Sequence, residues 1–278
     1  MTAAELPPGD LQGRGLPVNG LQVIDLQTSA RTALACLDLT SLNDGDTAAD
    51  IKALCQRAQS PHGATAAVCV WPRFVAQARA LLPKGIAVAA VANFPQGGTD
   101  IKQAVADTLQ IVQAGGDEVD VVIPYRHLDA AAALLAAVRA ACPQQSLKVI
   151  LETGELKDAA LIQRACALAL DAGADFLKTS TGKVAENATP ASAALLLTAI
   201  ATRSDAAGRV GFKPAGGVRT VADAALYIAL TAQHLGAAAV SPLRFRIGAS
   251  GLLNDIEALL GVHSKQAMQA AHPTSGSY

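Results

Sequence analysis

Short apolar stretches rich in β-branched residues alternate along the chain with longer alanine- and leucine-rich segments whose apolar positions recur at helical spacing. Eight of these stretches are expected as strands, at residues 32–38, 65–71, 87–93, 118–124, 147–153, 176–181, 210–213 and 244–250. Helix starts are marked by residues 43–46, 99–100, 189–190 and 220, and helix ends by glycines at 115–116 and 173. The pattern predicts one β/α unit, repeated.

Strands that are apolar on both faces must be covered on both faces, which favours a parallel sheet with crossover helices. Eight units fit a closed (β/α)₈ TIM barrel in a single α/β domain, residues 31–263. A doubly wound sheet would place G-x-G-x-x-G after the first strand, and the sequence has none there. Residues 1–30 are expected to form a loosely structured N-terminal extension and residues 264–278 a C-terminal tail.

Composition excludes several classes of protein. The chain of 278 residues is 51% hydrophobic and 16% charged with a net charge of −1, which is typical of a soluble globular protein. Without a basic stripe, nucleic acid is not an expected partner. We find no signal peptide and no apolar run of about 18 residues, so we expect a cytoplasmic protein without a membrane segment. Five scattered cysteines, without metal-type spacing, indicate reduced thiols, and we expect no metal or cofactor.

Charged residues interrupt several of the apolar strands. Asp38, Asp120, Lys148, Lys178 and Lys213 all lie within or at the end of a predicted strand. A buried, unpaired ammonium group costs several kcal/mol, so one interpretation is that each lysine pairs with an interior aspartate and only fills the barrel. The other interpretation is catalytic, because the carboxyl ends of barrel strands carry the active site.

Lys178 and Lys213 favour the catalytic interpretation because they lie on consecutive strands. Two ammonium groups about 6 Å apart, at an effective dielectric near 20, repel by roughly 2 to 3 kcal/mol, or about two pKa units. One amine would therefore be partly neutral near pH 7 and could attack a carbonyl carbon. The resulting imine can accept electrons from an adjacent carbon–carbon bond, which is class I aldolase chemistry.

Glycine-rich turns follow the last three predicted strands, at residues 181–183, 215–219 and 248–251. Such turns let backbone N–H groups approach an anion, and the last of them leads into a predicted helix. An ordinary turn is the alternative, but the phosphate site of such barrels follows strands seven and eight. The position favours a phosphate site.

Seven segments together resemble the deoxyribose-phosphate aldolase family: residues 37–43, 68–74, 93–95, 118–125, 147–156, 176–183 and 211–219. The resemblance implies a (β/α)₈ barrel that reversibly cleaves 2-deoxy-D-ribose 5-phosphate to acetaldehyde and D-glyceraldehyde 3-phosphate without a metal. It implies that Lys178 forms the Schiff base, that Lys213 perturbs it, and that Asp120 relays protons.

The resemblance also implies further site residues. The phosphate site would comprise Gly182, Lys183, Gly216, Gly217, Ser250 and Gly251, the last standing where relatives often have a second serine. The substrate pocket would comprise Asp38, Thr40, Cys69 and Lys148. Cys69 is interpreted as a lining residue rather than a thiol open to attack by unsaturated aldehydes. Tyr278 would assist proton transfer, although a terminal Gly-Ser-Tyr could also be only a tail.

Two other functions and the assembly stay open at this point. A transaldolase-like lyase would act on a longer sugar phosphate, and a non-catalytic barrel would bind a phosphosugar without forming an imine. Helices rich in alanine and leucine favour a homodimer. The N-terminal extension and residues 231–242 have no clear counterpart in the family and no assigned role.

Overall fold

The computed structural model describes residues 25–271, and for residues 262–271 it describes the helix without the side chains. Eight parallel strands form the centre: β1 (Leu37–Thr40), β4 (Ala67–Val70), β5 (Ala87–Ala92), β6 (Glu118–Val122), β7 (Ser146–Ile150), β8 (Phe176–Lys178), β9 (Gly211–Lys213) and β10 (Ile247–Ala249). A short hairpin, β2 (Gln59–Ser60) and β3 (Gly63–Ala64), lies apart from them.

The strands pair in the order β10-β1-β4-β5-β6-β7-β8-β9. Parallel bridges between Phe212 and Phe245 and between Ala215 and Gly248 join β9 to the segment that contains β10. This arrangement confirms the predicted barrel and excludes the doubly wound sheet, which would stay open at both edges.

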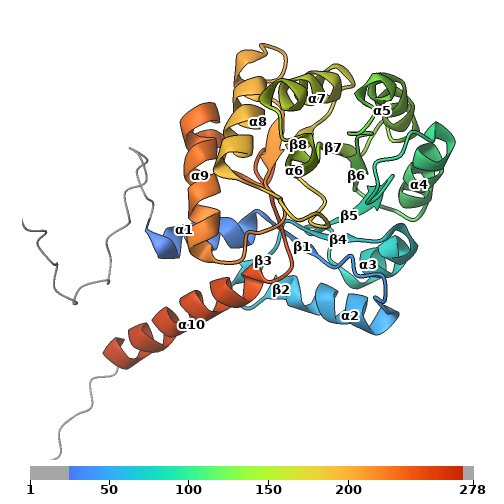
Figure 1. Cartoon of the computed structure of the whole chain (residues 1–278). Coiled ribbons are helices and arrows are strands. Elements are labelled where there is room, and N and C mark those ends of the chain that lie inside the picture. The colour runs from blue at the N-terminus through green and yellow to red at the C-terminus, as the bar shows by residue number, and fades with distance from the viewer. Residues whose placement is uncertain (1–24, 272–278) are drawn as a thin grey trace, which may run out of the picture.

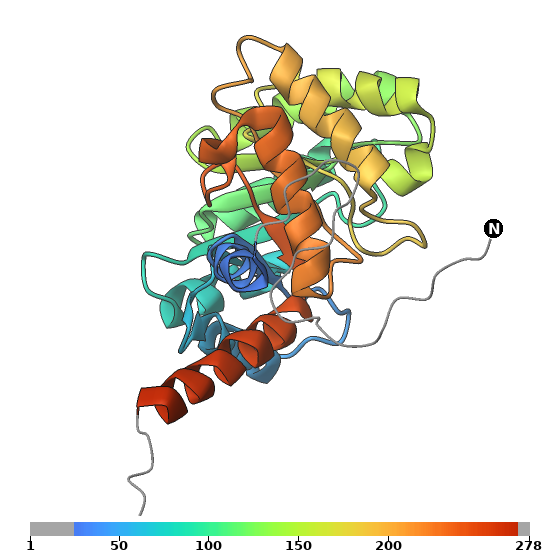
Figure 2. The same ribbon diagram turned by 90° about the vertical axis from the view of Figure 1, so that its left-hand side faces the viewer.

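Helices connect the strands and surround them (Figure 1). They are α1 (Leu26–Ala35), α2 (Ala48–Arg57), α3 (Val75–Leu81), α4 (Ile101–Gln113), α5 (Ala131–Ala141), α6 (Thr153–Leu156), α7 (Ala159–Asp171), α8 (Pro190–Thr202), α9 (Val221–Leu235) and α10 (Leu252–Ala271), with single 3-10 turns at Pro72–Phe74, Leu128–Ala130 and Ala237–Ala239. Figure 2 shows α1 end-on, where it packs against α9 and α10.

Three of the four predicted helix starts supply the cap. The side chains of Asp100, Thr189 and Thr220 each accept a hydrogen bond from a backbone N–H in the first turn of the helix that follows. At the start of α2 the cap is Thr47, just after the predicted residues 43–46. Gly115 and Gly173 follow the ends of α4 and α7 with φ of 84° and 78°, a conformation that glycine adopts without strain.

The start of the chain differs from the prediction. We expected a loosely structured segment to residue 30 and a strand from residue 32, but residues 26–35 form α1, capped by Asp25. Ala30, Ala33 and Leu34 are buried at a spacing of three and four residues, so helical periodicity outweighs the apparent strand pattern. Likewise, α10 includes residues 264–271, which we had assigned to the tail.

A repeated arginine–aspartate pair fixes two strands at their amino ends. Arg79 of α3 donates to backbone carbonyls before β5 and to Asp117, which also accepts from the N–H of Val88. Arg139 of α5 bonds Asp175 in the same way, and Asp175 accepts from the N–H of Leu147. Because each pair joins a helix to neighbouring strands, the site residues above them are held in register.

Candidate active site

The charges that interrupt the strands meet inside the barrel. Asp38 of β1, Asp120 of β6, Lys178 of β8 and Lys213 of β9 are all buried. The strand register pairs Lys178 with Lys213, so the two side chains project from neighbouring strands at the same height. The structure thus brings together four residues that lie far apart in the sequence.

The two amines share one carboxylate oxygen. Lys178 Nζ lies 2.8 Å from Asp120 Oδ2, and Lys213 Nζ lies 2.7 Å from the same atom. Lys213 Nζ has a second carboxylate, Asp38 Oδ2, at 2.5 Å. Among the residues that the structure describes, Lys178 has no other hydrogen-bond or ion-pair partner than Asp120.

This difference in partners separates the pKa values of the two lysines. Burial lowers the pKa of Lys178, and Asp120 opposes this shift, while the nearby Lys213 ammonium adds to it; the pKa stays below the ordinary value. Burial also acts to lower the pKa of Lys213, but Asp120 and Asp38 together raise it above the ordinary value. Lys178 is therefore the amine that loses its proton more easily.

The carboxylates stay ionised. Burial alone would raise the pKa of Asp120, but Lys148, Lys178 and Lys213 hold it well below its usual range. Asp38 behaves in the same way, since Lys213, Arg246 and Lys148 outweigh the effect of burial on its pKa. Asp120 is thus held as a carboxylate that accepts hydrogen bonds from both amines.

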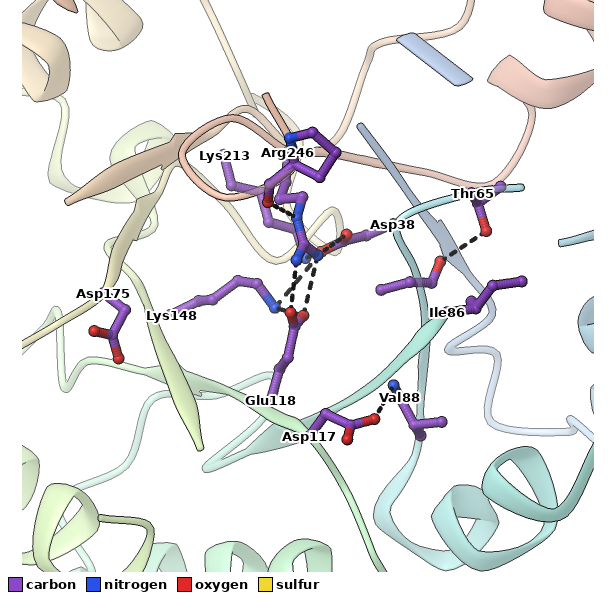
Figure 3. Close-up of polar contacts among 12 residues, drawn as sticks. Asp38, Thr65, Ile86, Val88, Asp117, Glu118, Lys148, Asp175, Lys213 and Arg246 are labelled. Carbon is purple, nitrogen blue, oxygen red and sulfur yellow. Dashed lines mark hydrogen bonds and ion pairs between the residues drawn. The ribbon is translucent and has the colours of Figure 1, made fainter. Parts of the chain in front are cut away.

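A second layer of charges lies beneath this group, toward the amino ends of the strands. Lys148 of β7 is fully buried, and its Nζ bonds Glu118 and, at 2.9 Å, Asp120 Oδ1. Arg246 donates to Glu118 Oε1 and to Asp38 Oδ1, both at 2.7 Å. Figure 3 shows Asp38, Glu118, Lys148 and Arg246 converging. The sequence analysis missed Glu118 and Arg246, although each lies two residues before an inward position, Asp120 or Gly248, and so shares its face.

The glycine-rich turns lie together at the carboxyl ends of the strands. A Cβ on Gly182 would lie 4.0 Å from Gly216 Cα, and Ala215 bridges Gly248. Gly182, Gly216 and Gly217 have φ of 83°, 78° and 84°. Lys183 Nζ donates to the carbonyl of Leu42, 2.7 Å away in the loop after β1. Ser250 and Gly251 are exposed just before α10.

Glu152 is a buried residue that the sequence analysis did not single out. It follows β7 with φ of 56°, an unusual backbone conformation for a residue with a side chain, and it accepts hydrogen bonds from the N–H and Oγ1 of Thr181. Burial raises the pKa of the Glu152 carboxyl. Glu152 therefore fixes the start of the turn that holds Gly182 and Lys183.

The opposite wall of the barrel mouth is apolar. Buried Leu42, Cys69, Ala89 and Val91 pack with Trp71 and Phe94. Burial, together with the Asp120 carboxylate, raises the pKa of the Cys69 thiol, which keeps it protonated. Thr40 Oγ1 donates to the carbonyl of Asp38 at the end of β1. Tyr278 lies outside the described residues.

Within residues 25–271, no helix is both long and apolar enough to span a bilayer. In the same part of the chain, no three histidine, cysteine or acidic side chains are grouped so that they could hold a metal ion.

Comparison with known proteins gives consistent matches. Residues 32–257 match the DeoC/LacD family aldolase model. A deoxyribose-phosphate aldolase of Agrobacterium fabrum is 51% identical over 236 residues, which cover 82% of this chain and 90% of that protein.

Solved structures of similar fold are consistent with these sequence matches. An apo-form structure from Toxoplasma gondii ME49, provisionally identified as a deoxyribose-phosphate aldolase, has a TM-score of 0.77 at 27% identity, covering 85% of this chain and 98% of that one. A tetrameric deoxyribose phosphate aldolase from Aeropyrum pernix shares the fold, with a TM-score of 0.67 at 24% identity, covering 85% of this chain and 97% of that one.

Proposed function

Because this chain belongs to the DeoC/LacD family of aldolases, we propose that it reversibly cleaves 2-deoxy-D-ribose 5-phosphate to D-glyceraldehyde 3-phosphate and acetaldehyde through a Schiff base on Lys178. The observation that carries the proposal is the arrangement of two buried amines on one Asp120 oxygen. Only Lys213 has a second carboxylate, so Lys178 is the amine poised to be neutral and nucleophilic.

The chemistry begins when neutral Lys178 Nζ attacks the C1 aldehyde of the open-chain sugar. Asp120 and Lys213, through a water molecule held between them, move the protons that convert the carbinolamine hydroxyl into leaving water and yield an iminium ion. The C2–C3 bond then breaks, its electron pair moves toward the iminium nitrogen, and the C3 hydroxyl loses its proton as D-glyceraldehyde 3-phosphate forms. The remaining enamine takes up a proton on carbon, and hydrolysis releases acetaldehyde and Lys178.

The substrate phosphate would lie at the glycine-rich turns. Backbone N–H groups of Gly182, Gly217 and Gly251, the Ser250 hydroxyl and the Lys183 ammonium group would bind it, and Gly216, whose N–H donates to the carbonyl of Gly248, would line the site. Lys183 would exchange its bond to the Leu42 carbonyl for the phosphate. Binding far from the reacting carbons would hold the sugar in register for bond cleavage.

The remaining pocket residues have supporting roles in this proposal. Asp38 holds Lys213 in its charged form, Lys148 does the same for Asp120, and Thr40 and Cys69 shape the wall of the pocket. Tyr278 would assist protonation of the enamine. Every other group of the proposed site lies between Asp38 and Gly251, within the barrel.

The cellular setting is part of the proposal. Five buried free cysteines favour the reducing cytoplasm, where the reaction would serve deoxyribonucleotide catabolism. A homodimer stays a prediction; partly exposed Leu81, Leu109 and Leu161 on the outer helices favour association of some kind.

Borohydride trapping tests the proposal. Reduction in the presence of deoxyribose 5-phosphate or acetaldehyde should leave a stable secondary amine on Lys178, identified by peptide mass mapping. The K178M variant should give no adduct, and K52M, which removes an exposed lysine of α2, should give the full amount. An adduct on Lys183 or Lys213 instead would refute the assignment.

The same experiment separates the alternatives. A transaldolase-like lyase would be trapped more efficiently with a ketose phosphate than with deoxyribose 5-phosphate. A phosphosugar-binding barrel would bind the sugar and give no adduct with either compound.

A further inference from the structure

The second layer of charges forms a continuous path to the reacting lysine. From Glu118 the path runs through Lys148 and Asp120 to Lys178, and from Arg246 it runs through Asp38 to Lys213. Glu118 and Arg246 close it at the far end with bonds of 2.7 and 3.2 Å. Figure 3 shows Glu118 and Arg246 facing one another below Lys213.

Glu118 and Arg246 lie away from the substrate end of the barrel. Arg246 borders a cavity of about 500 Å³ that is also lined by Lys84 and Asp117, before β5 and β6 at the amino ends of the strands. Its Nε donates to the carbonyl of Pro242 in the loop before β10. In the described part of the chain, neither Glu118 nor Arg246 bonds Lys178 directly. Their effect on Lys178 is therefore electrostatic and acts across the charges between them, without a direct bond.

The seven charges do not cancel when every group is ionised. Lys148, Lys178, Lys213 and Arg246 are cations, while Asp38, Glu118 and Asp120 are anions, so the buried network carries one excess positive charge. Because a buried excess charge is poorly screened, the network is balanced when one amine is neutral. Lys178 has the fewest carboxylate partners of the four cations, so it is the group that gives up a proton.

We propose that Glu118 and Arg246 are positioning residues that fix how readily Lys178 becomes neutral, and that they act with opposite sign. This inference rests on the proposed role of Lys178 in forming the Schiff base. The glutamate opposes loss of the proton and the arginine promotes it, so the pair holds the amine at a protonation balance that neither residue would give alone.

Charged and titratable groups on other elements also face Lys178, and they contribute to its pKa in every variant. They are Asp120 of β6, Lys213 of β9, Cys69 of β4, and Glu152 after β7, with Lys148 of β7 reaching it through Asp120. All of these residues are kept in the variants at Glu118 and Arg246, and of them only Lys148 bonds Glu118, so opposite shifts in the two variants report the second layer.

The test is the acidic limb of the pH profile of kcat/KM for cleavage of deoxyribose 5-phosphate, which reports the ionisation of Lys178 in the free enzyme. A unit charge roughly 10 Å away, at an effective dielectric of about 20, shifts a pKa by about one unit. Glu118→Gln removes a negative charge, and it should move this limb to lower pH by about one unit. Arg246→Met removes a positive charge and should move the limb to higher pH by a similar amount.

Four further variants separate this electrostatic role from a purely structural one. Arg246→Lys keeps the charge and should leave the limb at its original pH. The double variant Glu118→Gln/Arg246→Met restores the charge balance, so its limb should return toward that of the unsubstituted enzyme. Arg57→Met and Glu257→Gln, single changes in a surface pair between α2 and α10, should cause no shift.

Shifts in the same direction for both variants, no shift in Glu118→Gln, or a double variant that does not return would overturn the inference. Glu118→Gln is nearly isosteric and keeps hydrogen-bonding atoms toward its partners, so it decides the sign even if Arg246→Met fails to fold. Borohydride trapping in Glu118→Gln keeps the two proposals apart. Trapping on Lys178 without a shift refutes only the second-layer role, whereas absence of any adduct in the unsubstituted enzyme refutes the Schiff base itself.

Discussion

Lys178 and Lys213 carry the same side chain on neighbouring strands, yet their pKa values move in opposite directions. The sequence argument attributed the difference to mutual repulsion. In the structure, burial is the larger cause of the Lys178 shift, and the number of carboxylates decides which lysine is affected. Strand position alone could predict that Asp120, Lys178 and Lys213 converge. It could not predict how many carboxylates reach each amine, because that depends on side-chain length and direction.

A lysine that is easily deprotonated when folded costs stability. The unfolded Lys178 holds its proton up to about pH 10.5, whereas the folded one loses it at lower pH. The cost is complete below the folded pKa and declines as pH rises from that value toward 10.5.

The Lys178→Met variant should therefore be more stable than the unsubstituted enzyme at pH 7, because it removes a buried amine whose pKa folding lowers. Asp120 keeps Lys148 and Lys213 as partners, so no buried carboxylate is left alone. Calorimetric Tm values at pH 7 and pH 10 should show the gain shrinking at the higher pH, with Lys52→Met unchanged at both. A lower Tm for Lys178→Met at pH 7 would contradict the argument.

At the scale of elements, most of the predicted helices and strands followed from the spacing of apolar residues and from helix-capping residues. Asp100, Thr189 and Thr220 begin helices as expected because each supplies the oxygen that a first-turn N–H needs, whereas α2 begins after Thr47 and not at the predicted residues 43–46. Residues 32–35 were wrongly expected as strand, since a run of small apolar residues fits both periods and only packing of Ala33 and Leu34 decides between them. The loops were the least predictable, because contacts between distant turns shape them.

One such contact joins α6 to the loop after β8. A Cβ on Gly154 would lie 2.0 Å from the carbonyl oxygen of Glu186, so this loop follows its path only because residue 154 has no side chain. The loop also places Asn187 against Gly216, in the expected phosphate site.

Gly154→Ala should therefore displace the loop, lower the free energy of unfolding by about 1 to 3 kcal/mol, and raise KM for the phosphosugar more than it lowers kcat. Gly208→Ala is the matched control, because a Cβ there has no neighbour within 4 Å. Denaturant unfolding and steady-state kinetics of the two variants check this expectation. Equal KM values for both would show that the loop does not position the phosphate.

At the scale of the whole molecule, ion-paired side chains fill part of the barrel interior, where many barrels have layers of apolar side chains. The sequence revealed the aspartates and lysines of this interior but not Glu118 and Arg246, because both stand at strand starts, where a charge ordinarily faces solvent. Only the closed barrel, with β10 beside β1, brings Arg246 to Asp38.

This interior should make the enzyme sensitive to acid. The folded pKa values of Asp38 and Asp120 lie below their usual range, so their contribution to stability is full above about pH 4 and is lost as pH falls toward the folded values. Together they should lower the free energy of unfolding by roughly 3 kcal/mol per pH unit in that range.

Urea unfolding at pH 5, 3.5, 3 and 2.5 measures this loss, which approaches the full slope only below the unfolded pKa of 3.8. Asp129→Asn, which changes an aspartate with a side chain 94% exposed, should show the same slope as the unsubstituted enzyme. A free energy of unfolding that stays constant from pH 5 to pH 3.5 would contradict the expectation.

The bond between Asp38 and Arg246 joins residues 208 positions apart, so it also bears on how the chain is made. During synthesis from the amino terminus, Asp38 and Glu118 leave the ribosome long before their arginine exists. A nascent chain that collapsed early would have to bury two carboxylates without that cation, which is costly. The closed barrel therefore becomes stable only once the segment that contains Arg246 and β10 has been synthesised. In shorter nascent chains the cost of burying Asp38 and Glu118 without Arg246 disfavours a partly formed barrel.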